Sequence, residues 1–290
     1  MSGNRDMVGI LRHRQVAADI SCLNEAHRIL EAAGLQTWEV VRDAPYTSRD
    51  GRDLSRTRLL LTLGGDGTLL HGARLAAPRG IPLLGVNLGR LGFLTELEAD
   101  ELASGLERFL ADEHWLDERT LLDIEVVRED RRLVKAVGLN EAVVERATSG
   151  QLLRLRVLVD SQEVGVFDAD GVIAATSTGS TSYALAAGGP ILDPRVSGLV
   201  LVPMLPFALT MRPIVFPPKQ ALTVEITRAV GQLSVDGRRM RSLQEGDRVR
   251  VASHDQPLCL VRFSPRERFY SLLREKLGWG LPLVPTVRRG

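Results

Sequence analysis

The sequence predicts a two-domain protein: an N-terminal α/β domain on a parallel, doubly wound sheet, followed by a domain of mostly antiparallel strands. Three observations carry this prediction. Apolar runs alternate with helical patterns over the first third of the chain. From about Thr120 onward, segments rich in Val, Ile and Leu follow one another with short turns and few helical patterns. The length of 290 residues allows two ordinary domains.

Hydrophobic periodicity places the elements of the first domain in order. Helical patterns cover 17–34, closing on Gly34, and 68–77, stopping before Pro78. Strands that alternate with helices in this way favour a parallel, doubly wound sheet. The predicted strands lie within 7–11, 37–41, 55–65 and 81–89.

The second domain is predicted over residues 119–264 and the first over 1–118. Short strands separated by turns favour antiparallel pairing, and Asp236-Gly237 fits the turn of a β-hairpin. Residues 264–280 form an amphipathic pattern, with Phe269, Leu272, Leu273 and Leu277 on one face. We therefore expect a last helix that packs back on the first domain, so that 265–290 belongs with it.

Composition excludes several classes of protein. The formal net charge is +1 and no basic stripe is present, which argues against a nucleic-acid partner. The longest apolar segment, 199–218, is broken by prolines and carries Arg212, so no membrane helix is expected. Cys22 and Cys259 match no metal or redox spacing. Without a recognisable targeting segment, a cytoplasmic location is expected.

The stretch LLLTLGGDGTLLHGARLAA, residues 59–77, places an acid among three glycines at a strand-to-helix turn. Gly64, Gly65 and Gly67 let a ligand approach the backbone, and the N–H groups of the helix start favour phosphate. Asp66 has two interpretations. It is either an ordinary helix cap, or a carboxylate that accepts a proton from an attacking hydroxyl or helps hold a metal-bound triphosphate.

Two further glycine-rich runs fit a ligand site. Residues 85–98 lie where a strand of the first domain would end, and ligands gather at such ends in open parallel sheets. Within residues 171–191, the run 176–181 carries five hydroxyls that could face a phosphate or sugar, or could simply form a hydroxyl-rich β-turn without a ligand. These hydroxyls belong to Thr176, Ser177, Thr178, Ser180 and Thr181.

Taken together, these segments resemble the NAD kinases, particularly the bacterial type, also described as ATP/polyphosphate-dependent. Gly-Gly-Asp-Gly alone is only moderately specific, because lipid kinases and phosphofructokinase-like enzymes carry related forms. The ordered set is highly specific. It consists of GGDGT (64–68), GVNLGRLGFLT (85–95), LNEAVV (139–144), DGVIAATSTGSTSYALAAGGPIL (170–192), RPIVFP (212–217), SVDGR (234–238) and FYSLLREKLGW (269–279).

The resemblance implies transfer of the terminal phosphate of ATP, or of polyphosphate, to the 2′-hydroxyl of the adenosine ribose of NAD. It implies Mg²⁺ or another divalent cation. Because the sequence shows no His or Cys cluster beside the acidic pair Asp168 and Asp170, we expect this metal to arrive with the donor phosphates and not in a fixed cage of protein ligands. It also implies a Rossmann-like N-terminal domain and a C-terminal β-sandwich, the superfold shared with diacylglycerol kinases. A homodimer or homotetramer is implied, with the NAD site completed across subunits.

The resemblance also assigns roles to single residues. Asp66 matches the catalytic base, and Gly64, Gly65, Gly67 and Thr68 surround the donor phosphates. Asp170 matches an acid at the nicotinamide end that a neighbouring subunit could supply. The residues matched to NAD binding are Asp66, Gly67, Phe93, Asn140, Glu141, Asp170, Thr178, Thr181, Ser182 and Tyr183.

The sequence departs from the family pattern at two places. Ser177 and Ser182 stand where proline and alanine are common, and Phe207-Ala208 replaces a His-Ser pair frequent in bacterial relatives. Two other functions stay open beside NAD phosphorylation: a kinase of the same superfold acting on a lipid or sugar, and a non-catalytic dinucleotide sensor. Asp66 and the Asn140-Glu141 pair favour the kinase with a dinucleotide acceptor.

Overall fold

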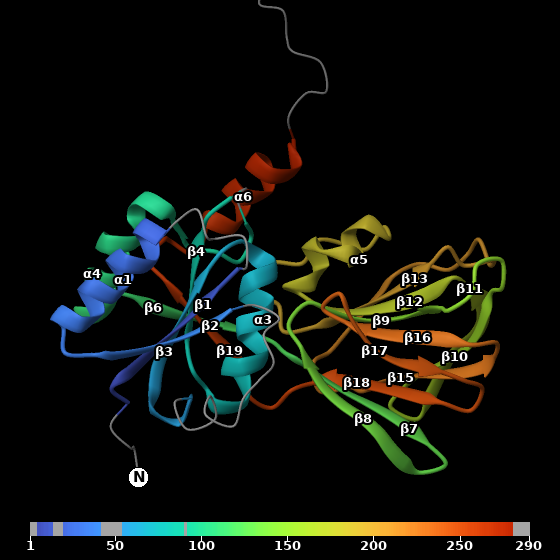
Figure 1. Ribbon diagram of the computed structural model, residues 1–290. Helices are drawn as coiled ribbons and strands as arrows, with labels where there is room; N and C mark the ends of the chain where they lie inside the picture. Colours follow the sequence, from blue (N-terminus) through green and yellow to red (C-terminus); the bar gives the residue numbers. More distant parts are fainter. Residues whose placement is uncertain (1–4, 14–19, 42–53, 90–91, 281–290) are drawn as a thin grey trace, which may run out of the picture. The chain divides into compact units, whose positions relative to one another are not determined.

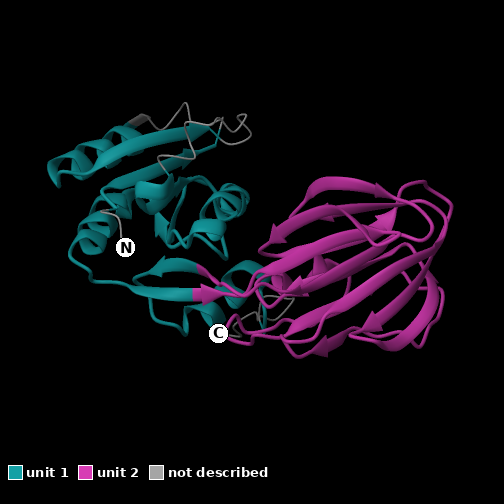
Figure 2. Ribbon diagram, turned by 90° about the horizontal axis from the view of Figure 1, so that it is seen from below, with its two compact units in different colours: residues 1–117, 259–290 teal, residues 118–258 magenta. Residues whose placement is uncertain are grey.

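The computed structural model describes residues 5–13, 20–41, 54–89 and 92–280. The chain divides into two compact units, residues 1–117 with 259–290 and residues 118–258 (Figure 2). Residues 259–264, expected from the sequence in the second domain, fall in the first unit. The reason is that β19 (Leu258–Arg262) joins the sheet of that unit.

The sheet of the first unit runs in the order β2-β1-β3-β4-β19-β6, with β5 beside β4. Strand β1 pairs in parallel with both β2 and β3, and β4 pairs in parallel with β3, β5 and β19. The chain therefore adds β2 on one side of β1 and then β3 on the other side. Ligands bind at the carboxyl ends of strands beside such a reversal of strand order. The bounds are β1 (Met7–Arg12), β2 (Gln36–Val41), β3 (Thr57–Leu63), β4 (Leu83–Asn87), β5 (Leu97–Glu98) and β6 (Trp115–Arg119).

Helices cover both faces of this sheet (Figure 1). On one face, α1 (Ile20–Ala32) and α4 (Leu102–Leu110) enclose an apolar core with alternate residues of β1, β3 and β4. On the other face lies α3 (Asp66–Ala76), where Gly72 allows a close approach to Thr62 and Leu83. The helix α6 (Arg268–Leu277) follows β19 and belongs to the same unit. The predicted doubly wound α/β domain is confirmed.

The second unit consists of two six-stranded sheets, with the orders β11-β10-β15-β18-β7-β8 and β14-β13-β12-β9-β16-β17. Buried side chains from both sheets, among them Leu155, Val224, Val144 and Ala174, form one core, so the unit is a β-sandwich. The all-β prediction is confirmed. The bounds are β7 (Leu122–Arg128), β8 (Arg131–Gly138), β9 (Glu141–Arg146), β10 (Leu153–Val159), β11 (Gln162–Ala169), β12 (Gly171–Thr176), β13 (Leu199–Met204), β14 (Ile214–Phe216), β15 (Leu222–Arg228), β16 (Gly231–Val235), β17 (Arg238–Leu243) and β18 (Arg248–Ser253).

Strand β12 is buried along its whole length. Its inner side chains, such as Ala174, face the core between the sheets. Its outer side chains, such as Ile173, pack with Ala184 of the short helix α5 (Tyr183–Ala186). The loop that joins β12 to α5 is thereby anchored at both ends.

Local expectations from the sequence are largely confirmed. Gly34 follows α1 with φ +76°, the left-handed conformation that ends a helix. Asp236 (φ +46°) and Gly237 (φ +73°) form the two-residue turn between β16 and β17. On α6, Leu272 is buried, whereas Leu277 is 41% exposed. Across the described residues, no helix has both the length and the apolar character needed to cross a membrane.

Candidate active site

The glycine turn joins β3 to α3, and its glycines serve different purposes. Gly64 has φ +151°, and a Cβ there would lie 2.4 Å from Thr68 Oγ1. Gly65 is the N-cap of α3, and an added Cβ would meet nothing within 4 Å. The turn thus brings backbone without side chains at Gly65 and Gly67 to a helix N-terminus, where anions are favoured.

Asp66 is the first residue of α3 and is not its cap, so the capping interpretation does not describe it. Its carboxylate reaches across to the next loop instead: the N–H of Phe93 donates to Oδ2 (2.8 Å) and the N–H of Leu94 to Oδ1 (3.0 Å). The side chain is 30% exposed. Each carboxylate oxygen keeps a second lone pair, so Asp66 can still accept a proton or a hydrogen bond from a ligand.

A cation and an aromatic ring lie beside this carboxylate. Lys276 of α6 places Nζ 3.9 Å from Asp66 Oδ2 and 4.2 Å from the centre of the Phe93 ring. The ammonium thus makes both an ion pair and a cation–π contact. Asp66, Phe93 and Lys276 come from three separate segments of the first unit and converge at the glycine turn.

The second unit contains a pair of buried polar side chains with unsatisfied atoms. Asn140 and Glu141 stand at the start of β9 and are 7% and 5% exposed. Among the described residues, Asn140 Oδ1 and Glu141 Oε2 have no hydrogen-bond partner. Buried polar atoms are costly when unpaired, so such a pair indicates groups that await a ligand.

Glu141 differs from an ordinary glutamate in its ionisation. Burial, and then the negative charge of Asp236, raise the pKa of Glu141 from 4.5 to about 7. The hydroxyl of Ser182, 3.5 Å from Oε1, and the N–H of Tyr183 act in the opposite direction without cancelling the rise. Near neutral pH, Glu141 can therefore either donate or accept a hydrogen bond.

Asp236 fixes the backbone of this pair. From the β16–β17 turn, its carboxylate accepts the N–H groups of Leu139 (2.9 Å), Asn140 (2.8 Å) and Glu141 (3.2 Å). Its own N–H donates to the carbonyl of Glu141 (3.0 Å). The hairpin turn thus orients the entry to β9 as well as reversing the chain.

Asp236→Asn is expected to lower the free energy of unfolding by about 2 kcal/mol, because an amide replaces a carboxylate that accepts several charge-assisted hydrogen bonds. Urea unfolding followed by circular dichroism measures the change. Asp130→Asn is the control, since Asp130 also has positive φ (+60°) but its side chain is 94% exposed. Equal losses in the two variants would contradict the role given to Asp236.

Known proteins match both units. A profile of the ATP-NAD kinase N-terminal domain matches residues 12–114, and one of the ATP-NAD kinase C-terminal domain matches 139–263. A protein named NAD kinase from Koribacter versatilis is 43% identical over 223 residues, which cover 76% of this chain and 77% of its own. The chain belongs to the NAD kinase family.

Other members support this membership over almost the whole chain. An NAD kinase from Chloroflexus aggregans is 38% identical over 277 residues, 94% of this chain and 98% of its own. The crystal structure of yeast NADH kinase complexed with NADH has a TM-score of 0.85 at 25% identity, covering 97% of this chain and 90% of that one. An Archaeoglobus fulgidus NAD kinase in complex with ATP has a TM-score of 0.73 at 22% identity, covering 92% and 97%, and so shares the fold.

The loop after β12, which the resemblance to NAD kinases assigns to NAD, uses most of its hydroxyls internally. Ser177, where proline is common in the family, donates to the carbonyl of Val196, so the departure ties the loop down. Thr178 Oγ1 lies 3.3 Å from Nη1 of Arg119. Three further hydroxyls donate to protein carbonyls: Thr176 to Leu139 (2.6 Å), Ser180 to Ser177 (2.7 Å) and Thr181 to Thr178 (3.2 Å).

Asp170 does not join the other site residues of the second unit. It precedes β12, whereas Thr178–Tyr183 follow it, and six strand residues span roughly 20 Å. The pairing with β9 agrees, since Glu141 lies opposite Ala175 and Glu145 opposite Gly171. Asp170 forms an ion pair with Arg146 instead (2.8 Å).

Gly92→Ala is expected to lower the turnover of this NAD kinase family member about tenfold if Asp66 is the catalytic base, because misplacing such a group by even 1 Å is costly. An added Cβ would lie 2.1 Å from Asp66 Oδ1 and would push the carboxylate aside. Steady-state kinetics of NADP formation tests this. Gly89→Ala is the control, because its Cβ would meet nothing within 4 Å, and equal kinetics in both variants would contradict the expectation.

Three residues near the site escaped the sequence analysis. Lys276 had a weak signal, as one of only three lysines in a chain with 37 Lys and Arg residues. Asp236 was predicted as a turn residue, with no sign of its contact to β9. Arg262, which contacts the loop beside Asp66, looks like any arginine at the end of a strand, and only the fold reveals it.

Proposed function

We propose that this chain transfers the terminal phosphate of ATP or polyphosphate to the 2′-hydroxyl of the adenosine ribose of NAD, with Asp66 as general base. The observation that carries this proposal is the placement of Asp66. Its carboxylate stands at the N-terminus of α3 inside the glycine turn, is oriented by two N–H groups and remains partly exposed. A ribose hydroxyl becomes a useful nucleophile when a positioned base takes its proton.

The donor phosphates would lie against the glycine turn, at Gly64, Gly65, Gly67 and Thr68. The helix N-terminus favours phosphate there, and the ammonium of Lys276 adds a positive charge within 3.9 Å of Asp66. This charge offsets the repulsion between an anionic base and an incoming phosphoryl group.

NAD binding is proposed for two sets of residues, one in each unit. Asp66, Gly67 and Phe93 of the first unit belong to this set, with Asn140 and Glu141 of the second. The unpaired buried oxygens of Asn140 and Glu141 support it, since ligand hydroxyls or amides would satisfy them. The loop after β12 adds Thr178, Thr181, Ser182 and Tyr183.

We propose that Mg²⁺, or another divalent cation, comes to the site with the donor phosphates. Within the described ranges, no three His, Cys, Asp or Glu side chains are grouped as metal ligands would be. Such cations commonly bind through substrate phosphates with few protein ligands. The cation would neutralise phosphate charge, while the acid–base step belongs to Asp66.

A homodimer or homotetramer is part of the proposal, with Asp170 serving the NAD site of a neighbouring copy. Its separation from the Asn140-Glu141 pair along β12 supports this role. Exposed apolar side chains at Leu205 (79%) and Phe207 (79%) support a surface for such a copy. Sedimentation velocity of the purified protein tests the state, and a monomer at assay concentration would contradict it.

The function is tested by an NADP-formation assay with NAD, Mg²⁺ and either ATP or polyphosphate. NADP from either donor supports the proposal and identifies that donor. Parallel assays with diacylglycerol or a free sugar as acceptor test the other kinase activities. Protein that binds NAD by calorimetry but forms no NADP with either donor would overturn the proposal in favour of a sensor.

A further inference from the structure

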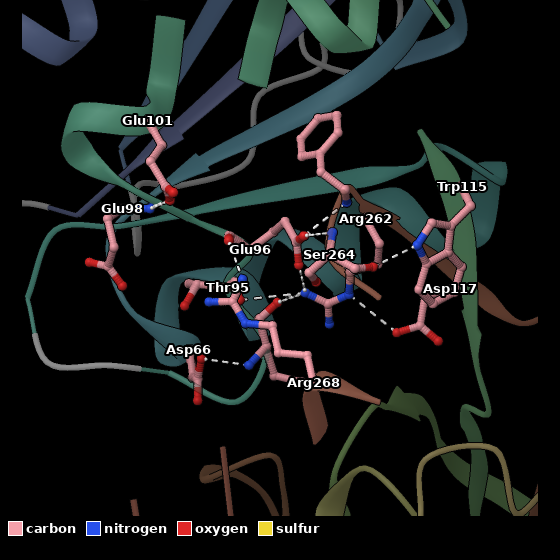
Figure 3. Close-up of polar contacts among 12 residues, drawn as sticks. Asp66, Thr95, Glu96, Glu98, Glu101, Trp115, Asp117, Arg262, Ser264 and Arg268 are labelled. Carbon is pink, nitrogen blue, oxygen red and sulfur yellow. Dashed lines mark hydrogen bonds and ion pairs between the residues drawn. The ribbon is translucent and has the colours of Figure 1, made fainter. Parts of the chain in front are cut away.

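Arg262, the last residue of β19, holds the loop beside Asp66 from the side opposite the carboxylate (Figure 3). Its Nη1 donates to the carbonyl of Leu94 (2.9 Å) and to Glu96 Oε2 (3.1 Å), and its Nε donates to Asp117 Oδ2 (3.2 Å). All of these residues belong to the first unit. One guanidinium therefore fixes a loop carbonyl and two carboxylates at once.

Leu94 links this arginine directly to Asp66. Its N–H donates to Asp66 Oδ1 (3.0 Å), while its carbonyl accepts from Arg262 (2.9 Å). The N–H of Leu94 is thus bound to Asp66, and its carbonyl is bound to Arg262. A shift of the guanidinium moves the carbonyl of Leu94, and through the same Cα it changes the direction of the N–H.

The arginine and its main partner are buried, with side chains 7% exposed for Arg262 and 3% for Glu96. Glu96 Oε1 also accepts the N–H groups of Phe263 (2.8 Å) and Ser264 (2.7 Å). Removing such charges from water is costly, and apolar residues of similar volume often give equal stability. Stability alone therefore does not explain why an arginine stands at this position. The fixed geometry of the hydrogen bonds that its guanidinium makes does explain it.

The same cluster connects to the helix that carries Lys276. Arg268, the first residue of α6, places Nη1 3.4 Å from the carbonyl of Glu96. The carbonyl of Ser264 accepts the indole N–H of Trp115 (2.9 Å), which ties the segment before α6 to β6. The cluster thus contacts both the loop whose N–H groups reach Asp66 and the first residue of the helix that carries Lys276.

We propose that Arg262 is a positioning residue for phosphoryl transfer: it keeps the N–H groups of Phe93 and Leu94 aimed at Asp66 and so fixes the orientation of the base. The inference rests on the proposed role of Asp66. Arg262 acts through the loop and does not contact a substrate. Its removal therefore affects the rate of transfer far more than the binding of NAD.

The test is a double-mutant cycle with Arg262→Lys and Asp66→Asn, measuring kcat, KM for NAD and thermal stability in all four proteins. Lysine keeps the buried charge but cannot reach the carbonyl and both carboxylates together. In the otherwise unchanged protein, Arg262→Lys is expected to lower kcat about 10- to 100-fold with KM for NAD within about threefold. In the Asp66→Asn background it should lower kcat less than about twofold, because the group that it orients is already gone.

Arg128→Lys is the matched control. Arg128 makes a comparable two-point contact with the buried Asp247 in the second unit, at 2.6 and 2.9 Å. It is expected to lower stability and leave kcat unchanged. If Arg262→Lys fails to fold, Asp117→Asn replaces it, since it weakens the contact to Nε and keeps the arginine; its fall in kcat should likewise vanish in the Asp66→Asn background.

A loss of kcat of the same factor in both backgrounds would overturn the positioning role, and so would an unchanged kcat in Arg262→Lys. Either outcome, with NADP still formed by the unaltered protein, leaves the proposed function intact. Failure of that protein to form NADP would be a failure of the proposed function instead. The two failures are therefore distinguishable.

Discussion

Asp66→Asn is expected to lower the kcat of NADP formation by about 10²–10⁴-fold, the usual contribution of a positioned general base. Asparagine has the same shape as aspartate, but it cannot take a proton from the ribose hydroxyl. It also loses the ion pair to Lys276 and presents an amide N–H₂ to one of the two loop N–H groups. Steady-state kinetics with saturating donor, together with calorimetric titration of NAD, measures the effect.

The binding measurement separates catalysis from folding in this experiment. The variant should still fold and still bind NAD while turnover falls, although the lost ion pair and the opposed N–H groups lower its melting temperature. Asp6→Asn is the control. Asp6 is also in the first unit and also pairs with a cation, Arg56, but it lies directly before β1, away from the glycine turn. A variant at position 66 that turns over at a near-normal rate would show that Asp66 anchors the loop without acting as the base.

The site of the first unit could be found from the sequence because its signal is local. Three glycines and one acid occupy four consecutive residues, and the end of an apolar run and the start of a helical pattern place them at a strand-to-helix turn. The strands that precede and follow are continuous apolar runs, which is typical of parallel strands buried on both faces. Periodicity was therefore enough to predict both the fold class and the position of Asp66.

Helix α4 could have been predicted from hydrophobic periodicity too, although no helix was predicted there. Leu102, Leu106 and Phe109 repeat at helical spacing and are all buried. The place of β19 is a different case, because its apolar run resembles those of the strands before it. That it leaves the second unit and pairs with β4 in the first depends on the whole fold.

The partners of the candidate site residues could not be predicted from local patterns either, because their contacts also depend on the whole fold. Lys276, Arg262 and Asp236 are each distant along the chain from the residues they contact. Their pairing is decided by sheet order and helix packing, which no short window contains. Local patterns and the family resemblance thus predicted candidate site residues, and the structure supplied the residues that hold them in place.

Glu141→Gln is expected to stabilise the ligand-free protein at pH 8 relative to the unaltered protein, and to lose this advantage near pH 5. The pKa of Glu141 is raised from 4.5 to about 7, chiefly by burial and then by the charge of Asp236. Between these two values the folded state binds more protons than the unfolded state, so stability falls as pH rises. Above about pH 7, folding must bury a carboxylate whose Oε2 has no partner among the described residues.

The size of this effect follows from the two pKa values. At about 1.4 kcal/mol per pH unit, the interval between 4.5 and about 7 corresponds to about 3 kcal/mol. Glutamine has the same shape and does not ionise, so its variant lacks this slope. Urea unfolding at pH 5, 6, 7 and 8 in the absence of nucleotide should show the difference between the two proteins growing with pH and levelling above about pH 7.

Asn140→Ala is the control for this measurement, because it alters the same pair and keeps the titrating group. Its difference from the unaltered protein should stay constant with pH, whatever its size. A constant difference for Glu141→Gln as well would mean that Glu141 ionises alike in the folded and unfolded chains. A difference between Glu141→Gln and the unaltered protein that grows with pH would instead mean that Glu141 is protonated below pH 7. Beside Asn140 at the entry to β9, the protonated side chain would meet a dinucleotide as a hydrogen-bond donor.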